Sequence, residues 1–240
     1  MKLKSIGFLF LALIFALPAA AQDGAPSDDL REDLNTARKR AAEAAKSFRE
    51  MMSKPDSAIP AALLDKAKAV IIVPGTLRVA FGLGGRGGRG VVSRRTVNGW
   101  SEPAFIKIGG GSFGAQIGVS KTDYILLVMN DGGLKGLMED GFELGGDVGA
   151  VAGPIGRSAG ASTNPTLDAE ILSYSKAKGL YAGVALKGIR IYADNNLNNK
   201  VYKKDAKAIL GTDSGMPIGQ MPSGVSIVPQ TLTRFSPVKG

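Results

Sequence analysis

Six short apolar segments that follow one another closely limit the possible folds of this chain more than any other feature of its sequence. Each segment is rich in β-branched residues or alternates in character, which predicts strands. The segments are residues 70–73, 77–83, 90–96, 100–108, 112–119 and 124–129. A parallel sheet needs a crossover of about a dozen residues or more between strands, and these connections are shorter. The sequence therefore predicts an antiparallel meander, with a tight hairpin turn at Asn98-Gly99.

Helical periodicity appears on both sides of these strands. After Ser27, a predicted N-cap, apolar residues recur at alternating spacings of four and three, which predicts an amphipathic helix. Its apolar stripe is Leu30, Leu34, Ala37, Ala41, Ala44, Phe48 and Met51. Because much of the stripe is alanine, we expect the helix to pack on the domain. Shorter helices are predicted over residues 60–67, 131–139 and 204–210, and further strands over 142–151, 169–175 and 180–192.

The first 21 residues have the features of a secretory signal peptide. Lys2 and Lys4 precede an apolar run over residues 5–17, and small residues lead to a cleavage site after Ala21. A bilayer-spanning helix needs about 20 apolar residues, and this run is shorter. The sequence also has no cysteine for a bacterial lipoprotein anchor. We therefore expect the protein to be exported, as a periplasmic or secreted protein.

The rest of the chain is predicted to form one domain over residues 28–210 and a tail over residues 211–240. The tail holds four of the 12 prolines without a sustained apolar period, so an irregular or disordered segment is expected. Trp100 lies in an alternating segment and is expected to be buried in the sheet.

The chain has no histidine and no cysteine, which removes several classes of chemistry. Ser-His-Asp and Cys-His nucleophiles, zinc sites of the usual kind and disulfides are excluded. Residues 82–87 match G-x-G-x-x-G without a following helix, and residues 156–160 match G-x-S-x-G without a base. Residues 194–205 could form a calcium loop or a polar turn rich in asparagine, and the sequence leaves both open. We expect no enzyme activity and no cofactor, and we assign no metal site.

Positive charge is concentrated in one part of a chain whose net charge is +9. Between Asp65 and Glu102 there is no acid, and the seven cations are Lys66, Lys68, Arg78, Arg86, Arg89, Arg94 and Arg95. The guanidinium fork binds phosphate oxygens in pairs, and neighbouring glycines allow a headgroup to approach. Residues 84–90 are therefore a candidate phosphate-binding loop, and the alternative is a solvated basic loop. Nucleic acid is disfavoured because aromatic residues make up 6% of the chain.

The chain resembles the SYLF lipid-binding domain family over roughly residues 30–212. The motifs that carry the resemblance are AKAVIIVP at 67–74, GRGVV at 88–92, WSEPAFI at 100–106, GGGSFGAQIG at 109–118, AGPIGR at 152–157 and YSKAKGLYAG at 174–183. The resemblance implies an α+β domain, a twisted barrel-like antiparallel sheet with an N-terminal amphipathic helix and short accessory helices. It also implies binding of phosphoinositide or another anionic lipid, partly through that helix, without catalysis.

Eukaryotic members of the SYLF family also serve as an actin-binding module. An exported protein would meet neither cytosolic actin nor phosphoinositides, so the expected ligand is an anionic phospholipid of the cell envelope. We expect a non-enzymatic protein that lies peripherally on a membrane surface and binds anionic membrane lipids. The alternative is a structural or protein-interaction module of the envelope, in which the apolar stripe or the tail docks a protein partner. Neither hypothesis includes a nucleic acid or a small-molecule substrate.

The candidate lipid-binding residues fall into two groups. Arg86, Arg89, Arg94 and Arg95 are expected to dominate, because cations near an anionic membrane contribute about 1 kcal/mol each. The secondary candidates are Lys66, Lys68 and Arg78, together with Arg38, Lys39 and Arg40 of the N-terminal helix.

Overall fold

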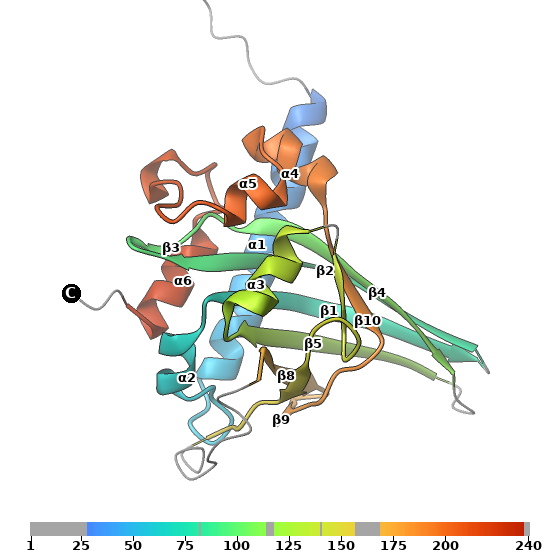
Figure 1. The fold of residues 1–240 in the computed structure, drawn as a ribbon. Coiled ribbons are helices and arrows are strands. Elements are labelled where there is room, and N and C mark those ends of the chain that lie inside the picture. The colour runs from blue at the N-terminus through green and yellow to red at the C-terminus, as the bar shows by residue number, and fades with distance from the viewer. Residues whose placement is uncertain (1–27, 82, 114–117, 140, 157–168, 238–240) are drawn as a thin grey trace, which may run out of the picture.

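The computed structural model describes residues 28–81, 83–113, 118–139, 141–156 and 169–237 (Figure 1). The expected signal peptide over residues 1–21 lies outside this part of the chain, as does most of the G-x-S-x-G pattern. Within the described residues, no helix combines the length and the apolar character needed to span a membrane.

One twisted, nearly closed sheet forms the centre of the fold (Figure 1). Its strands follow the order β6-β10-β4-β2-β1-β5-β8-β7, and β3 pairs with β2 and β9 with β8. The strands are β1 Ala69–Phe81, β2 Leu83–Thr96, β3 Gly99–Trp100, β4 Ala104–Phe113, β5 Gly118–Val128, β6 Phe142–Leu144, β7 Ala150–Ala152, β8 Ile171–Ala177, β9 Leu180–Gly183 and β10 Ile189–Ala193. The α+β, barrel-like architecture expected from the sequence is confirmed.

The expectation of a purely antiparallel sheet is corrected at one edge. β7 runs parallel to β8, and the sheet is therefore mixed. The segment between these strands, residues 153–170, is long enough for the crossover that a parallel pair requires.

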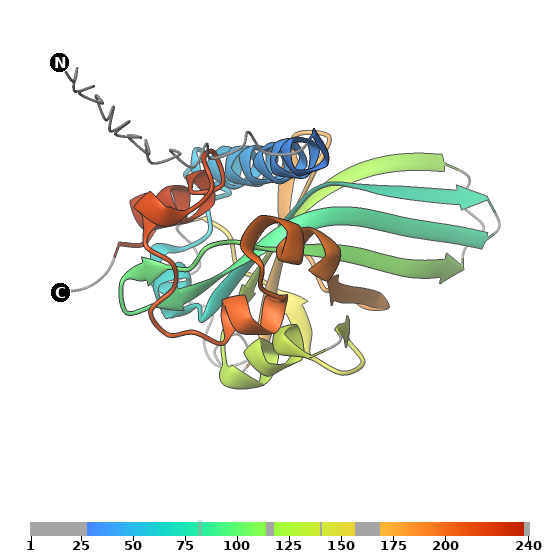
Figure 2. The same ribbon diagram turned by 90° about the horizontal axis from the view of Figure 1, so that it is seen from above.

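Helices lie on both faces of the sheet (Figure 2). They are α1 Asp28–Met52, α2 Ala61–Lys66, α3 Asp131–Met138, α4 Asn195–Tyr202, α5 Ala206–Leu210 and α6 Ile227–Phe235, with a 3-10 turn at Ile218–Gln220. α1 and α6 cover one face, and α3 and α5 cover the other. The N-terminal helix and the short helices predicted within residues 60–67, 131–139 and 204–210 are all present.

The predicted apolar stripe of α1 packs on the domain. Ala41, Ala44, Phe48 and Met51 are buried, and α1 contacts β1, β2, α4 and α6. The alanines lack bulk, so the helix axis can approach the sheet closely. The expectation that α1 docks on the domain is confirmed.

The tail predicted to be irregular is partly helical, and this prediction is corrected. α6 buries Val228 and Leu232, and Val225 just before it is also buried. The ring of Phe235 packs edge-on against Phe48 of α1, with ring centres 5.8 Å apart. Pro229 lies in the first turn of α6, where proline removes no helical hydrogen bond. The prolines and glycines of this segment therefore mark its turns and the start of its helix, and do not exclude a helix.

Residues 194–205 do not form a calcium loop, so that interpretation is overturned. Most of the segment is helix α4. The two carboxylate oxygens of Asp194 already pair with Arg40 at 2.7 Å and Lys107 at 2.8 Å. The side-chain amide of Asn198 both donates to and accepts from the backbone of β4. The asparagine-rich segment therefore links α4 to β4 of the sheet through hydrogen bonds.

Candidate functional site

β2 carries the predicted phosphate-binding stretch, and strand alternation divides its two central arginines. Arg89 lies opposite Lys107 of β4 and faces α1, where it lines a groove with Lys39. Arg86 lies opposite Arg78 of β1 and faces a different cavity, which contains no residue of α1. Side chains three positions apart on a strand point to opposite faces. The single basic surface expected from the sequence is therefore two separate surfaces.

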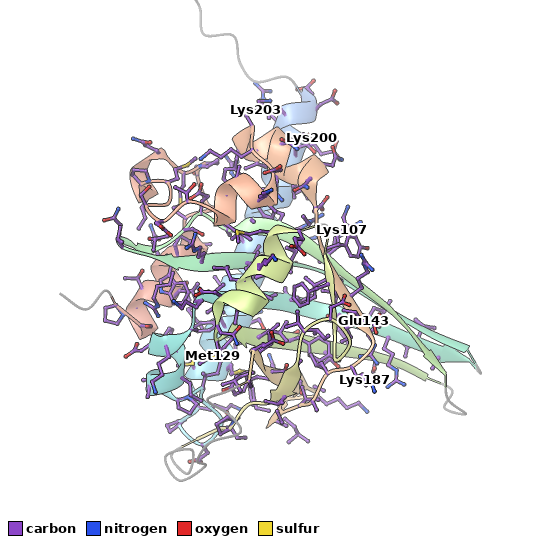
Figure 3. The ribbon with its side chains drawn as sticks, in the orientation of Figure 1. Lys107, Met129, Glu143, Lys187, Lys200 and Lys203 are labelled. Carbon is purple, nitrogen blue, oxygen red and sulfur yellow. The ribbon has the colours of Figure 1, made fainter. Side chains whose placement is uncertain are left out.

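The groove between α1 and the sheet has a volume of about 920 Å³. Two of its cations, Arg40 and Lys107, both form ion pairs with the single carboxylate of Asp194. Figure 3 labels Lys107. Burial disfavours the charged form of Asp194, but the hydrogen bonds and the positive charges of Lys107 and Arg40 together outweigh burial and hold its pKa below the ordinary value. Lys39 and Arg89 make no ion pair with any described residue and lie beside one acid, Glu43. These two cations remain available to a ligand.

The long ends of β1, β2, β4 and β5 project beyond the helices (Figures 1 and 2). On the α1 side of this projection, Leu77, Val79 and Val119 are 48%, 46% and 71% exposed. Val79 faces Val119 across the β1–β5 pair, and Leu77 faces Lys121. We call Leu77, Val79, Val119, Lys121 and Arg89 the projecting surface. It places apolar side chains between two exposed cations.

In the part of β2 beside Leu77 and Val79, glycines leave the surface of the sheet without side chains. Gly85 lies opposite Val79, and Gly87 lies opposite Leu77. A Cβ at position 85 would meet nothing within 4 Å, so no packing contact requires glycine there. Because neither residue has a side chain, a flat partner can approach the apolar side chains of β1 without obstruction.

Arg94 and Arg95 lie at the other end of β2, and the protein itself occupies their guanidinium groups. Arg94 donates to the carbonyl of Leu210 at 2.8 Å and pairs with Asp213 at 2.5 Å. Arg95 donates to the carbonyls of Leu64 and Ala67 and to the hydroxyl of Ser236. These contacts join β2 to α2 and to the C-terminal segment, so both arginines have a structural role.

The remaining candidates are dispersed. Lys66 and Lys68 are exposed near the start of β1, far along the strand from the projection, and Lys68 lies 3.7 Å from Asp131. Arg38 donates to the carbonyl of Ser223 at 2.8 Å and ties α1 to the segment before α6. Of the ten predicted residues, Lys39, Arg40 and Arg89 line the groove that contains Leu77, and Arg40 is paired with Asp194.

Lys121 and the three apolar residues of the projecting surface were not predicted from the sequence as functional residues. The signal was present in the alternation of β1, where Leu77 and Val79 share a face, but the exposed face could not be identified. Only the path of α1 decides that these positions lie outside the core.

Comparison with known proteins identifies related chains. A sequence model of the Ysc84 family, described as Las17-binding protein actin regulator, matches residues 109–232. This is the family that the SYLF-like motifs resemble, and the matched region extends through most of α6.

Curated relatives are about one-third identical to this chain over the aligned residues. LAS seventeen-binding protein 3 of Saccharomyces cerevisiae is 36% identical over 157 residues, which cover 64% of this chain and 34% of the relative. Human SH3 domain-containing YSC84-like protein 1 is 32% identical over 197 residues, which cover 80% of this chain and 57% of the relative. The matched region thus spans about a third of the yeast protein and just over half of the human one.

Proposed function

The chain belongs to the Ysc84 family, and we propose that it is an exported, non-catalytic module that binds anionic phospholipid surfaces through the projecting surface. The observation that carries this proposal is the placement of Leu77, Val79 and Val119 together on one face of the projecting strands, beside Lys121 and Arg89. The absence of histidine and cysteine supports a binding role over a catalytic one.

The energetics fit reversible attachment to a membrane. Burial of apolar surface contributes about 25 cal/mol per Å². Each cation near an anionic bilayer adds about 1 kcal/mol. Three partly exposed aliphatic side chains and two or three cations therefore give weak binding that depends on both lipid charge and salt. Such a surface suits a peripheral protein that lies on the membrane.

A protein partner is the second candidate function. The family description refers to Las17 binding and actin regulation, and the yeast relative's name refers to Las17 binding. The same exposed apolar side chains could contact a protein, because apolar patches also mark protein interfaces. In that case binding would not depend on the charge of a lipid bilayer.

Vesicle flotation distinguishes the two functions. We expect the full chain to float with vesicles that contain phosphatidylglycerol and not with vesicles of phosphatidylcholine alone, and to be released by salt. The triple variant Leu77→Ser, Val79→Ser and Val119→Ser should lose flotation. Its matched control is Val97→Ser, because Val97 is 71% exposed in the turn at the far end of β2.

A second set of variants tests how much the cations of the projecting surface contribute to vesicle binding. Arg89→Gln with Lys121→Gln should weaken flotation, whereas Lys207→Gln, an exposed lysine of α5, should not. Equal flotation of all variants, or no preference for anionic vesicles, would reject the lipid function and favour a protein partner. Mass spectrometry of protein purified from an expressing cell tests export, since removal of residues 1–21 is expected.

A further inference from the structure

Two arginines face each other directly on the side of the sheet away from α1. Arg78 of β1 pairs with Arg86 of β2 in the antiparallel register. Like charges at directly opposed positions destabilise a sheet. Such a pair therefore has an unfavourable energy unless a negative charge lies between or beside the two guanidinium groups.

The surroundings supply no such negative charge. The two arginines line a cavity of about 370 Å³. Its other lining residues are Thr76, Ser120, Thr122, Tyr124, Val184, Ala185, Leu186 and Lys187. No carboxylate is among them, and Lys187, on the loop after β9 (Figure 3), is a third cation. Within the described part of the chain, neither Arg78 nor Arg86 forms an ion pair.

Three polar atoms of this cavity are buried without a hydrogen-bond partner among the described residues. They are the Nε atoms of Arg78 and Arg86 and the hydroxyl of Thr76, whose residue is 2% exposed. Buried donors in native proteins almost always have a partner, and an unsatisfied charged donor is especially unfavourable. The three donors therefore point to a ligand that accepts hydrogen bonds.

The position of the Thr76 hydroxyl requires a glycine at position 88 of β2. A Cβ at position 88 would lie 2.8 Å from the Thr76 hydroxyl oxygen, which is closer than atoms in contact can approach. A larger residue at position 88 would push Thr76 out of its position. Glycine at position 88 therefore leaves room for the Thr76 side chain, which lines the cavity.

We propose that this cavity binds the phosphate group of a phosphate monoester. Guanidinium groups bind phosphate oxygens in pairs through their planar fork, and three cations match a dianion better than a monocarboxylate. The hydroxyls of Thr76, Ser120 and Thr122 provide further donors, while Val184 and Leu186 form an apolar wall for an attached organic group. The phosphate can come from a soluble monoester or from a lipid with a terminal phosphate.

The site is independent of the projecting surface, because Arg78 and Arg86 lie on the opposite face of the sheet from Arg89. Loss of one function therefore does not imply loss of the other. Variants of the projecting surface should keep phosphate binding, and variants of the arginine pair should keep the salt-sensitive flotation on phosphatidylglycerol vesicles.

Isothermal titration calorimetry of the full chain tests the proposal with inorganic phosphate, glycerol 3-phosphate and acetate. Phosphate and its monoester should bind, and acetate should bind at least tenfold more weakly, a difference of about 1.4 kcal/mol. Arg78→Gln and Arg86→Gln should each weaken phosphate binding by roughly tenfold or more, because each removes one of the two forks. Lys207→Gln on α5 is the matched control and should bind normally.

A measurement on the unmodified protein keeps the test valid if an arginine variant fails to fold. In a nitrogen–proton spectrum, the Nε–H signals of Arg78 and Arg86 should shift when phosphate is added, and the Nε–H signal of Arg95 should not. Competition by vesicles with phosphatidic acid would identify a lipid source, and its absence a soluble one. No heat and no shift of these signals with phosphate up to about 10 mM, far above a typical binding constant, would overturn the proposal.

Discussion

The guanidinium carbon of Arg95 lies 4.1 Å from the centre of the indole ring of Trp100. The indole is 4% exposed, and its Nε1 donates to the carbonyl of Ser236. The hydroxyl of Ser236 accepts from Arg95 and donates to Asp65. These contacts join the β2–β3 hairpin, α2 and the C-terminal segment. The expectation that Trp100 is buried is confirmed.

We predict that Arg95→Lys destabilises the protein. An ammonium group cannot reproduce the several hydrogen bonds of the fork, and one charged hydrogen bond contributes about 1.5–3 kcal/mol. Chemical denaturation should show a lower free energy of unfolding, with Lys66→Gln near wild type. Burial lowers the pKa of Arg95, while the Asp65 carboxylate opposes this effect, and the group stays charged at neutral pH.

Tryptophan emission supplies a separate prediction, because Trp100 is the only tryptophan of the sequence. The spectrum of the free protein should be that of a buried indole and should not move to shorter wavelength when anionic vesicles are added. A shift on vesicle addition would show that Trp100 enters the membrane.

We predict that Leu232→Ala in α6 destabilises the fold by about 2–5 kcal/mol, the usual effect of truncating a buried leucine. Leu232 is fully buried, whereas Leu180 is 77% exposed. Leu180→Ala should therefore change the free energy of unfolding by less than about 0.5 kcal/mol. Equal stability of the two variants would mean that α6 does not dock on α1 in solution.

The sequence was informative wherever a local period governs structure, and weak wherever distant residues meet. Spacings of three and four predicted α1, and alternation predicted the central strands. The ion pair between Arg40 and Asp194 joins residues far apart in the chain, and no local pattern indicates it. The separation of Arg86 from Arg89 follows from the strand period, but the glycine-rich residues 84–90 were predicted to be a loop and are part of β2.

Acid should destabilise the protein through Asp194. Its folded-state pKa lies below the unfolded value because the hydrogen bonds and the positive charges of Lys107 and Arg40 together outweigh burial. The unfolded state therefore binds more protons, so the contribution of Asp194 is fully present above its unfolded pKa and is lost as pH falls through the folded pKa. Asp194→Asn should lower the melting temperature at neutral pH. Below about pH 4, the melting temperature of this variant should decrease less with falling pH than that of the wild type. An identical pH profile in the variant would contradict this account.

The opposed arginines yield a prediction that concerns stability without any ligand. Replacing Arg86 by Gln removes a like charge opposite Arg78. A directly opposed like-charge pair opposes folding by about 0.2–1 kcal/mol. In phosphate-free buffer at low ionic strength, Arg86→Gln should therefore melt higher than wild type by roughly 0.4–4 °C for a chain of this size.

Added salt should reduce the difference in melting temperature between Arg86→Gln and wild type, because salt screens the repulsion between Arg78 and Arg86. In the presence of phosphate the wild type should melt higher than Arg86→Gln, because a bound ligand stabilises the folded state and the wild type binds phosphate more tightly. A lower melting temperature for Arg86→Gln in the absence of phosphate would show that the two guanidinium groups stabilise the folded chain without an anion.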